Sequence, residues 1–435
     1  MSVNAAMPAH KTATEDEASL RDRMLGLGAA ARQAAHSLAA AEDARKTTAL
    51  RTAAARLRAR AGEVQTANGR DMDAARARGL DAALLDRLEL TPQRIEGMAA
   101  GLEAIADLPD PTGRTLAEWD RPNGLKIARV SVPFGVVGII YESRPNVTAD
   151  AAGLCIKAGN AAILRGGSES YHSAGAILAC LHEGLAAAGL SDAAVQRVPT
   201  TDRTAVGMLL GMDEYVDVIV PRGGKSLIER VRTESRIPVL AHLDGNNHIY
   251  VQVSCDPDMA CAVVHNAKLR RPGICGAVET VLIDRAAVES HLPRLIDTLA
   301  GAGCEVRGDA TVRAADARVV AATGDDWDTE FLAPVVAMKV VESLGEAIAH
   351  VNCHGSGHTE AILTGDDAAA AAFTARVDAA IVMVNASTQF ADGGEFGMGA
   401  EIGIATGKLP PRGPVGAAEL TGYKYVVRGT GQTRP

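Results

Sequence analysis

The composition of the sequence and the spacing of its apolar residues change after residues 109–113, PDPTG, and this change most constrains the fold. From about residue 17 to residue 108 the chain is rich in Ala, Arg, Leu and Glu, with apolar residues at helical spacing. This pattern predicts helices whose charged faces are solvated. The segment 125–141, LKIARVSVPFGVVGIIY, is instead typical of strands, because it alternates at its start and is continuously apolar at its end.

Strands and helices are expected to alternate along the rest of the chain. Helices are expected at about 171–188 and 227–233. Further strands are expected at 161–164, 216–220, 249–253, 281–283, 335–341, 361–364 and 380–385. This rhythm predicts an α/β architecture with largely parallel sheets, which bind ligands at the carboxyl ends of their strands. A chain of 435 residues is too long for one core, so two or three domains are expected.

The charge balance excludes some classes of partner. The chain carries 53 acidic and 44 basic residues, a formal net charge of -9, and only 3% of its residues are aromatic. Nucleic acid and anionic membranes are therefore not expected as partners, although a local basic site for an anionic ligand is compatible with these values. No apolar run reaches the length of a membrane span.

The seven cysteines show no regular spacing, so they predict no disulfide framework and fit a reducing cytoplasm. The N-terminal segment is polar and lacks the apolar core of a signal peptide. Residues 1–15 are expected to be a disordered leader.

One of these cysteines lies in an unusual setting. Cys275 follows Arg271-Pro272-Gly273 and precedes Gly276, just before a strand-like run. A thiol in a tight, glycine-containing loop near cations and free amides is expected to have a lowered pKa and to act as a nucleophile. The alternative is a surface-loop cysteine with no role.

Two further loops resemble each other. One reads Arg165-Gly166-Gly167-Ser168 and the other reads Arg222-Gly223-Gly224-Lys225-Ser226, and each follows an apolar strand. A serine is available to cap the helix that follows each loop. Glycine amides, a helix N-terminus and an arginine favour an anion, so the pair is predicted to hold the phosphates of a dinucleotide. The alternative is two ordinary turns, and no standard GxGxxG is present.

Three other segments contain candidate residues. Asn146 follows Pro145, where its amide would donate to an oxyanion or, alternatively, form a turn. The segment 350–358, HVNCHGSGH, invites a metal interpretation, but its glycines break the helix that would align its histidines, so no metal site is predicted. Arg412, in a glycine-rich C-terminal region, is a candidate for anion binding or for a structural contact.

Together these segments resemble the gamma-glutamyl phosphate reductases, also called glutamate-5-semialdehyde dehydrogenases, of the aldehyde dehydrogenase superfamily. The resemblance covers nearly everything from about residue 17 onward. It is carried by YESRPNVTADAA (141–152), AILRGGSES (162–170), IVPRGGKSL (219–227), HNAKLRRPGICGAVET (265–280), EFLAP (330–334), HGSGHTEAILT (354–364) and the glycine-rich segment 384–416.

The resemblance implies a role for each matching residue. Cys275 is the nucleophile, and Asn146 holds the oxyanion together with the amide of Cys275. Glu330 and Phe331 position the nicotinamide ribose, and Arg144 and Arg412 are candidates for binding substrate anions. The cofactor is expected to be NADPH, held by Arg165, Gly166, Gly167, Ser168, Arg222, Gly223 and Gly224.

The implied reaction is the reduction of L-glutamyl 5-phosphate by NADPH to glutamate 5-semialdehyde and phosphate, in proline biosynthesis. The Cys275 thiolate would attack the acyl phosphate, and phosphate would leave to give a thioester. Hydride transfer would then form an oxyanion held by Asn146 and backbone N–H groups. A homo-oligomer is expected, with a glutamate 5-kinase as the partner that hands over the labile substrate.

The resemblance also divides the chain into domains. The NADPH-binding domain is expected at 16–122 and 143–255, with the N-terminal helices as part of it. The catalytic domain with Cys275 is expected at 256–395. An oligomerisation arm with the C-terminal segment is expected at 123–142 and 396–435.

Two departures from the family pattern concern neighbours of Cys275. Gly276 stands where the family commonly has Asn, and Asn247 stands where it often has Cys. The main alternative is an aldehyde dehydrogenase that oxidises another semialdehyde to the acid, and such enzymes need a general-base Glu. By approximate alignment that position is His242, which favours phosphate over water as the acyl acceptor.

Two other classes remain open. A cysteine hydrolase or acyltransferase without nicotinamide would need a histidine base, for which His248 and His265 are candidates, and it would leave the Arg-Gly-Gly loops unexplained. A catalytically silent oligomerising relative is the last alternative.

Overall fold

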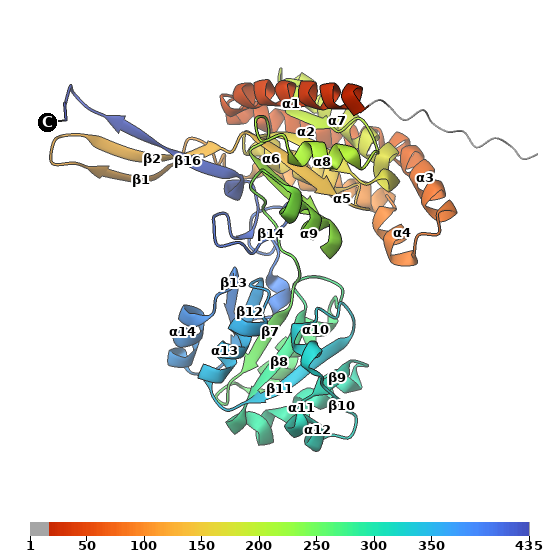
Figure 1. Ribbon diagram of the computed structural model, residues 1–435, viewed down its shortest axis with the longest axis vertical. Coiled ribbons are helices and arrows are strands. Elements are labelled where there is room, and N and C mark those ends of the chain that lie inside the picture. Colours follow the sequence, from red (N-terminus) through yellow and green to blue (C-terminus); the bar gives the residue numbers. More distant parts are fainter. Residues whose placement is uncertain (1–16, 435) are drawn as a thin grey trace, which may run out of the picture.

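The computed structural model describes residues 17–434 and contains two α/β units with a protruding ribbon (Figure 1). The predicted leader at 1–15 lies outside the described residues. The first unit is built on a four-stranded parallel sheet in the order β5-β4-β3-β6. Its strands are β3 (Val136–Tyr141), β4 (Ala161–Gly166), β5 (Val195–Arg197) and β6 (Val218–Arg222).

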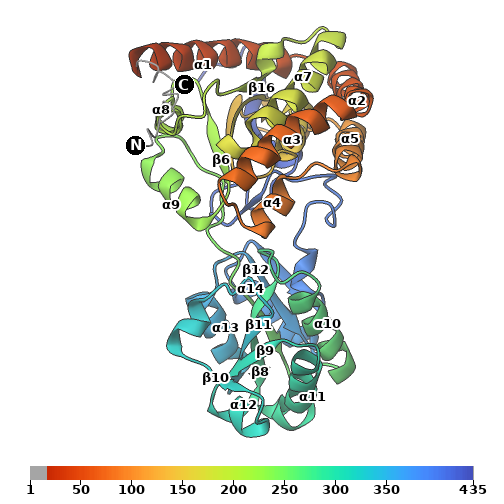
Figure 2. The same ribbon diagram turned by 90° about the vertical axis from the view of Figure 1, so that its right-hand side faces the viewer.

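Helices cover both faces of this sheet, which explains why β3 is apolar throughout. Val137 and Ile139 pack in one core with α2, α5, α6 and α7, while Val136 and Ile140 pack on the other face with α1 and α8. Figure 2 shows α1 lying across the top of this unit. The helices are α1 (Glu17–Ala39), α2 (Asp43–Ala59), α3 (Ala61–Ala77), α4 (Ala82–Leu88), α5 (Pro92–Asp107), α6 (Val147–Lys157), α7 (Tyr171–Ala187), α8 (Thr204–Leu210) and α9 (Lys225–Glu234).

The second unit contains a seven-stranded parallel sheet in the order β10-β9-β11-β8-β7-β12-β13. Its strands are β7 (Asn247–Val251), β8 (Val278–Asp284), β9 (Glu305–Gly308), β10 (Val320–Ala321), β11 (Val335–Val341), β12 (Thr359–Leu363) and β13 (Ile381–Val384). Its helices are α10 (Pro257–Leu269), α11 (Val288–Gly301), α12 (Ala310–Ala315), α13 (Leu344–His354) and α14 (Asp367–Arg376). Ile249 and Tyr250 pack in separate cores, so this sheet is also covered on both faces.

The ribbon is a three-stranded antiparallel sheet in the order β1-β2-β16, and it extends away from the first unit (Figure 1). Its strands are β1 (Thr115–Asp120), β2 (Lys126–Pro133) and β16 (Thr421–Arg428). Trp119, Tyr423 and Tyr425 are exposed on it, and the Tyr425 ring contacts each of the other two edge to face. We refer to this three-stranded sheet as the arm.

The α/β architecture with parallel sheets is confirmed, and 125–141 divides into β2 and β3 at Gly135, whose φ is 126°. Three strands lie outside the predicted domain limits. β7 belongs to the seven-stranded sheet, so the limit at 255 is too late, because the unit begins before that strand. β3 belongs to the four-stranded sheet rather than to the arm, and β1 belongs to the arm, because its partner is β2.

The chain crosses between the two units twice. The first crossing, 235–246, leads from α9 to β7, and the second leads back through the short strand β14 (Ile404–Ala405), which pairs with β15 (Gly413–Pro414). The two crossings touch, because Thr406 N donates to Ala241 O at 3.2 Å. Figure 2 shows the two units stacked with these segments between them. Within residues 17–434, no helix is long and apolar enough to cross a membrane.

Candidate active site

Cys275 lies on the loop between α10 and β8, at the end of the second unit that faces the first. Asn247, the first residue of β7, holds the loop through hydrogen bonds to its backbone. Asn247 Nδ2 donates to Cys275 O at 2.6 Å and to Ala277 O at 2.7 Å, while its Oδ1 accepts from Thr359 N at 3.1 Å. The Asn247 side chain is fully buried, so this departure from the family pattern fixes the backbone of the nucleophile loop.

Two glycines bring other backbone segments close to the same loop. A Cβ on Gly245 would lie 2.1 Å from Cys275 O, so only glycine allows the first crossing to pass there. A Cβ on Gly276 would lie 3.3 Å from Thr388 O, which is tight rather than forbidden. Glycine at 276 therefore relieves a close contact, and Asn there would need a small shift of the neighbouring 3₁₀ turn.

Two histidines meet Cys275. Its Sγ and one ring nitrogen each of His242 and His358 lie within 4.8 Å of one another. His242 belongs to the first crossing and His358 immediately precedes β12, and their rings are 5.1 Å apart, edge to face. The candidates for a cysteine hydrolase were wrong: His248 is buried against Glu360, and His265 is exposed on α10.

The hydrogen bonds of His242 determine which nitrogen is free. His242 Nδ1 lies 2.9 Å from Ile404 O. A carbonyl only accepts, so Nδ1 carries the proton, and Nε2 of the neutral ring is left with its lone pair. Burial lowers the pKa of His242 below 6.5, as Arg222 also does, so the ring is neutral at pH 7 and Nε2 is a base.

The thiol of Cys275 has a raised pKa, which corrects the expectation of a lowered one. Burial raises this pKa to about 11, and nearby Glu401 and Glu330 also raise it, while Arg222 opposes them. The sequence shows the cations of the loop but not its burial among distant segments, which include Gly245 and His358. At neutral pH the thiol is protonated, so attack needs a proton acceptor, and His242 is placed to be one.

Arg222 ends β6 and begins the second Arg-Gly-Gly loop, and its side chain lies against the return segment between the units. A Cβ on Gly403 of the return segment would be 3.3 Å from Arg222 Cδ. The Arg222 charge acts on the pKa values of Cys275, His242, Asp150 and Glu401. Desolvation and the Arg222 cation together lower the pKa of Arg144 to about 10, so two guanidinium groups lie near the nucleophile.

Asn146 lies immediately before α6, at the carboxyl end of β3. Its Nδ2 donates one hydrogen to Asp150 Oδ2 at 3.0 Å. Burial raises the pKa of Asp150 to about 6, with Asn146 and Arg222 acting in the opposite direction. Asp150 therefore orients the Asn146 amide, whose second hydrogen is not used by this bond.

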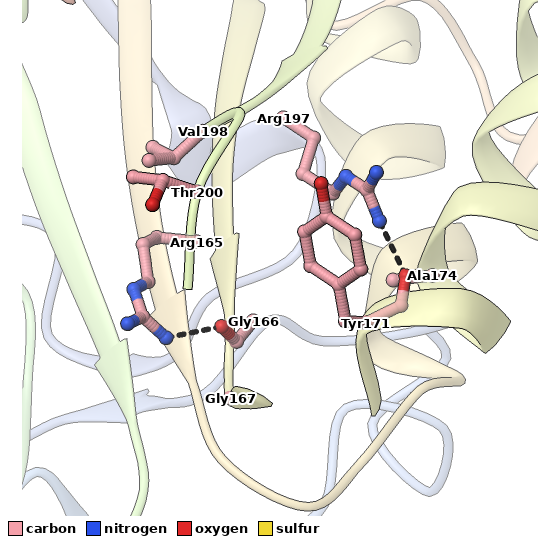
Figure 3. Close-up of a pocket in the computed structure, with 8 residues that line it drawn as sticks. All are labelled: Arg165, Gly166, Gly167, Tyr171, Ala174, Arg197, Val198 and Thr200. Carbon is pink, nitrogen blue, oxygen red and sulfur yellow. Dashed lines mark hydrogen bonds between the residues drawn. The ribbon is translucent and has the colours of Figure 1, made fainter. Parts of the chain in front are cut away.

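The first Arg-Gly-Gly loop lines a cavity at the carboxyl end of β4 (Figure 3). Arg165 is buried, donates to Gly166 O and Thr201 O, and has an Nε with no hydrogen-bond partner among the described residues. Arg197 stacks over the Tyr171 ring at 3.9 Å on the other side of the cavity. Two guanidinium groups facing one cavity, one of them with an unpaired buried N–H, suit an anionic group.

The second loop faces the interface between the units. Its Gly223 and Gly224 precede α9, and Gly224 N donates to Glu142 Oε2 at 3.1 Å. Lys225 reaches across to Asp244 on the first crossing, with Nζ 3.1 Å from Oδ2. Neither Ser168 nor Ser226 caps a helix, because Gly167 precedes the 3₁₀ turn Ser168–Ser170, Ser170 precedes α7 without a side-chain cap bond, and Gly224 precedes α9.

Ser168 is engaged elsewhere, since its Oγ accepts from Arg78 Nη1 at 3.2 Å. The cap geometry leaves backbone N–H groups at both helix starts as the donors for an anion.

Glu330 and Phe331 lie beside the nucleophile loop. Glu330 Oε1 accepts from Gly245 N at 2.9 Å, and its carboxylate is close enough to raise the pKa of Cys275. The Phe331 ring packs under two cations, with Lys268 Nζ 5.8 Å and Arg307 Cζ 5.2 Å from its centroid. Lys268 is itself fully buried in an ion pair with Glu279, so the Glu279 carboxylate has a structural partner.

Arg412 and the other histidines of 350–358 are not brought to Cys275. Arg412 Nη2 pairs with Asp378 Oδ1 at 2.9 Å at the edge of the second unit. His350 and His354 lie on α13 with their rings 4.4 Å apart, and α13 ends before His358. The glycines therefore separate His358 from them, as predicted.

The placement of His358 and of the Arg222 charge close to Cys275 was not predicted from the sequence. His358 was weighed only with its sequence neighbours, and Arg222 only as part of a phosphate loop. The positions of these residues relative to the strands could have indicated their placement. Arg222 ends a strand of one sheet and His358 immediately precedes a strand of the other, and these strand ends face each other across the two units.

Known proteins resemble this chain over nearly all of its length. The model of the aldehyde dehydrogenase family matches residues 21–312 and 317–400. A gamma-glutamyl phosphate reductase from Rhodospirillum rubrum is 61% identical over 412 residues, covering 95% of this chain and 96% of that protein. One from Rhodopseudomonas palustris is 57% identical over 430 residues, covering 99% of this chain and 100% of that protein.

The fold agrees with a solved structure as well. The crystal structure of gamma-glutamyl phosphate reductase from Thermotoga maritima has a TM-score of 0.92 and 42% identity, and the match covers 95% of this chain and 100% of that one. The nucleophile loop, the two Arg-Gly-Gly loops and the Glu330-Phe331 pair all lie within the matched residues. The chain therefore belongs to the aldehyde dehydrogenase family and, within it, to the gamma-glutamyl phosphate reductases.

Proposed function

We propose that this chain reduces L-glutamyl 5-phosphate to glutamate 5-semialdehyde and phosphate, with NADPH as the reductant and a thioester on Cys275. The observation that carries the proposal is the placement of Cys275. Its thiol lies beside a neutral histidine base and within reach of the Arg222 charge, where the carboxyl ends of the first unit's parallel strands face the amino ends of the second unit's strands.

The first step is the activation of the thiol. His242 Nε2 takes the proton of Cys275, and the thiolate attacks the acyl carbon of the substrate. The bond from carbon to the phosphate oxygen breaks, and the protonated His242 returns the proton to the departing phosphate. The products of this step are a Cys275 thioester, hydrogen phosphate and neutral His242, so protons and charges balance.

The second step is reduction of the thioester. NADPH, when bound, supplies the hydride. The resulting tetrahedral oxyanion would be held by the free amide hydrogen of Asn146 and by the amide of Cys275. Collapse breaks the carbon–sulfur bond, releases the aldehyde and leaves a thiolate that takes up one proton from solvent.

The positive side chains divide between the two anionic ligands. Arg165 and Arg197 line the cavity of the first unit, which suits the 2′-phosphate that distinguishes NADPH from NADH. Gly166, Gly167, Gly223 and Gly224 leave room for the backbone to approach the pyrophosphate. Arg222 and Arg144 lie near Cys275 and would hold the acyl phosphate.

The test is phosphate-dependent reduction of NADP⁺ with glutamate 5-semialdehyde, the reverse reaction. Wild type should require phosphate, Cys275→Ala should be inactive, and Cys353→Ala, at an exposed free cysteine, should match wild type. Turnover that does not depend on phosphate would defeat the assignment in favour of an aldehyde oxidation to the free acid. Full activity of Cys275→Ala would defeat every mechanism with a thioester.

The arm formed by β1, β2 and β16 supports a homo-oligomer, since its exposed aromatic residues have the character of an interface. The hand-off from a glutamate 5-kinase and the cytoplasmic location remain predictions from the sequence.

A further inference from the structure

His358 has no place in the reaction just described, yet the fold places it at the nucleophile. It immediately precedes β12, is fully buried, and its Nδ1 lies 2.8 Å from Thr359 Oγ1. Its Nε2 has no hydrogen-bond partner among residues 17–434. A buried polar nitrogen without a partner is uncommon in native proteins and points to a missing ligand.

Three donor atoms meet at this point. Cys275 Sγ and a ring nitrogen of His242 and of His358 lie within 4.8 Å of one another. Both rings already use Nδ1, toward Ile404 O and Thr359 Oγ1, so each has Nε2 left over. One thiolate and two neutral imidazoles are the donor set that zinc prefers.

The dimensions of the cluster suit such an ion. Two ligand atoms of a tetrahedral zinc site lie about 3.5 Å apart, given bonds of about 2.0–2.3 Å. The three donor atoms lie within 4.8 Å of one another, and side-chain rotations that bring them about 1 Å closer would place them at three of the four ligand positions of a tetrahedral ion. Glu330 and Glu401, whose charges already act on Cys275, would offset the remaining positive charge.

We propose that His242, Cys275 and His358 form a reversible site for a thiophilic divalent cation, Zn²⁺ above all, and that the bound ion blocks the nucleophile. On binding, the Cys275 thiol releases its proton and the thiolate ligates the ion, so no electron is transferred. The fourth position is left for water or phosphate. Inhibition by the ion rests on the proposed function, in which Cys275 attacks the substrate. Binding of the ion does not depend on that function.

This site differs from the one that the sequence segment 350–358 suggests. His350 packs against His248, with ring centroids 5.4 Å apart, and against Trp327 at 5.7 Å. Cys353 is exposed on α13. The two sites would share only His358, so substitutions at the other residues distinguish them.

The binding experiment uses the full chain and Co²⁺ as a coloured substitute for Zn²⁺. Titration should produce the intense thiolate-to-cobalt absorption with release of a proton, and excess Zn²⁺ should abolish it. Zn²⁺ should also protect Cys275 from alkylation by iodoacetamide, and a chelator should restore the alkylation. These readouts need no turnover, so they stand even if the reductase assignment fails.

His358→Gln is the variant that tests the cluster, with His350→Gln as its matched control at a second buried histidine. His358→Gln should weaken Zn²⁺ binding by roughly tenfold or more, because even residues that only orient a metal ligand contribute about that much. It should retain reductase activity but resist Zn²⁺, whereas His350→Gln should stay as sensitive as wild type.

Three results would overturn the proposal. The first is a wild-type protein in which Zn²⁺ does not protect Cys275 from alkylation. This measurement does not depend on the folding of any variant. The second is equal Zn²⁺ affinity in wild type and folded His358→Gln. The third is loss of the cobalt signal in His350→Gln or Cys353→Ala, which would assign the ion to the segment 350–358 instead.

Discussion

Replacing His242 by Gln removes the base next to the nucleophile while changing little else. The Gln amide is similar in length to the imidazole and retains a donor for Ile404 O, which His242 Nδ1 now serves at 2.9 Å. It has no basic nitrogen near neutral pH. The variant therefore isolates the proton transfer from Cys275.

The expected loss follows from the raised pKa of Cys275, about 11. With that value, about one thiol in ten thousand is ionised at pH 7 without a base, and about one in a hundred at pH 9. A positioned general base contributes about 10²–10⁴-fold to a rate. We expect kcat/KM of His242→Gln to fall at least ~100-fold at pH 7 and to rise ~10-fold per pH unit toward pH 10.

The sign of this pH dependence follows from the two groups. The pKa of Cys275 is raised, so the thiolate fraction grows as pH rises, and the variant recovers activity in alkaline solution. The pKa of His242 is lowered below 6.5, so the base is already free at pH 7 and the wild-type profile should be flat from there upward.

The assay measures both the reduction rate and the rate of Cys275 alkylation by iodoacetamide from pH 6 to pH 10. His350→Gln is the control, since His350 is also buried with a lowered pKa but packs away from Cys275. A His242→Gln protein with the wild-type profile in both assays would refute the role of His242.

Other substitutions test the cofactor cavity and the support of the loop. Arg165→Gln should raise KM for NADPH by about 10–100-fold, the equivalent of a lost charged hydrogen bond, and leave KM for NADH unchanged in steady-state assays. Lys268→Met should lower the free energy of unfolding in urea by about 3–5 kcal/mol, because it leaves Glu279 buried and unpaired. Adding Glu279→Leu should restore most of that loss. Asn247→Ala should cost about 1–3 kcal/mol for each backbone carbonyl that loses its donor, seen as a lower Tm.

The sequence predicted the parts of the fold that depend on local periodicity. The run 125–141 showed alternation followed by continuous apolarity, and it became the half-exposed β2 and the fully buried β3. The helix starts were predicted less well. Serines were available in both Arg-Gly-Gly loops, but Ser168 begins a 3₁₀ turn and Ser226 lies inside α9, so neither side chain caps a helix, because the backbone path into each helix decides the cap.

The candidate site was predicted where its chemistry is contained in one segment. The loop around Cys275 was identifiable from its own residues, but the pKa of its thiol was not, because the groups that surround the thiol, His242 and His358 among them, come from segments distant in the sequence. His358 was missed for a similar reason. Its neighbours in sequence suggested a metal motif, while its neighbours in space are His242 and Cys275, which two different segments supply.

The position of His242 has a consequence for how the two units work together. His242 lies on the first crossing, its ring is oriented by Ile404 on the return crossing, and Cys275 belongs to the second unit. A rotation of the units would therefore change the distance between base and nucleophile directly. The two Arg-Gly-Gly loops, which we propose to bind the cofactor, lie on the first unit, so we expect a ligand that fixes the units relative to each other to affect the proton transfer as well.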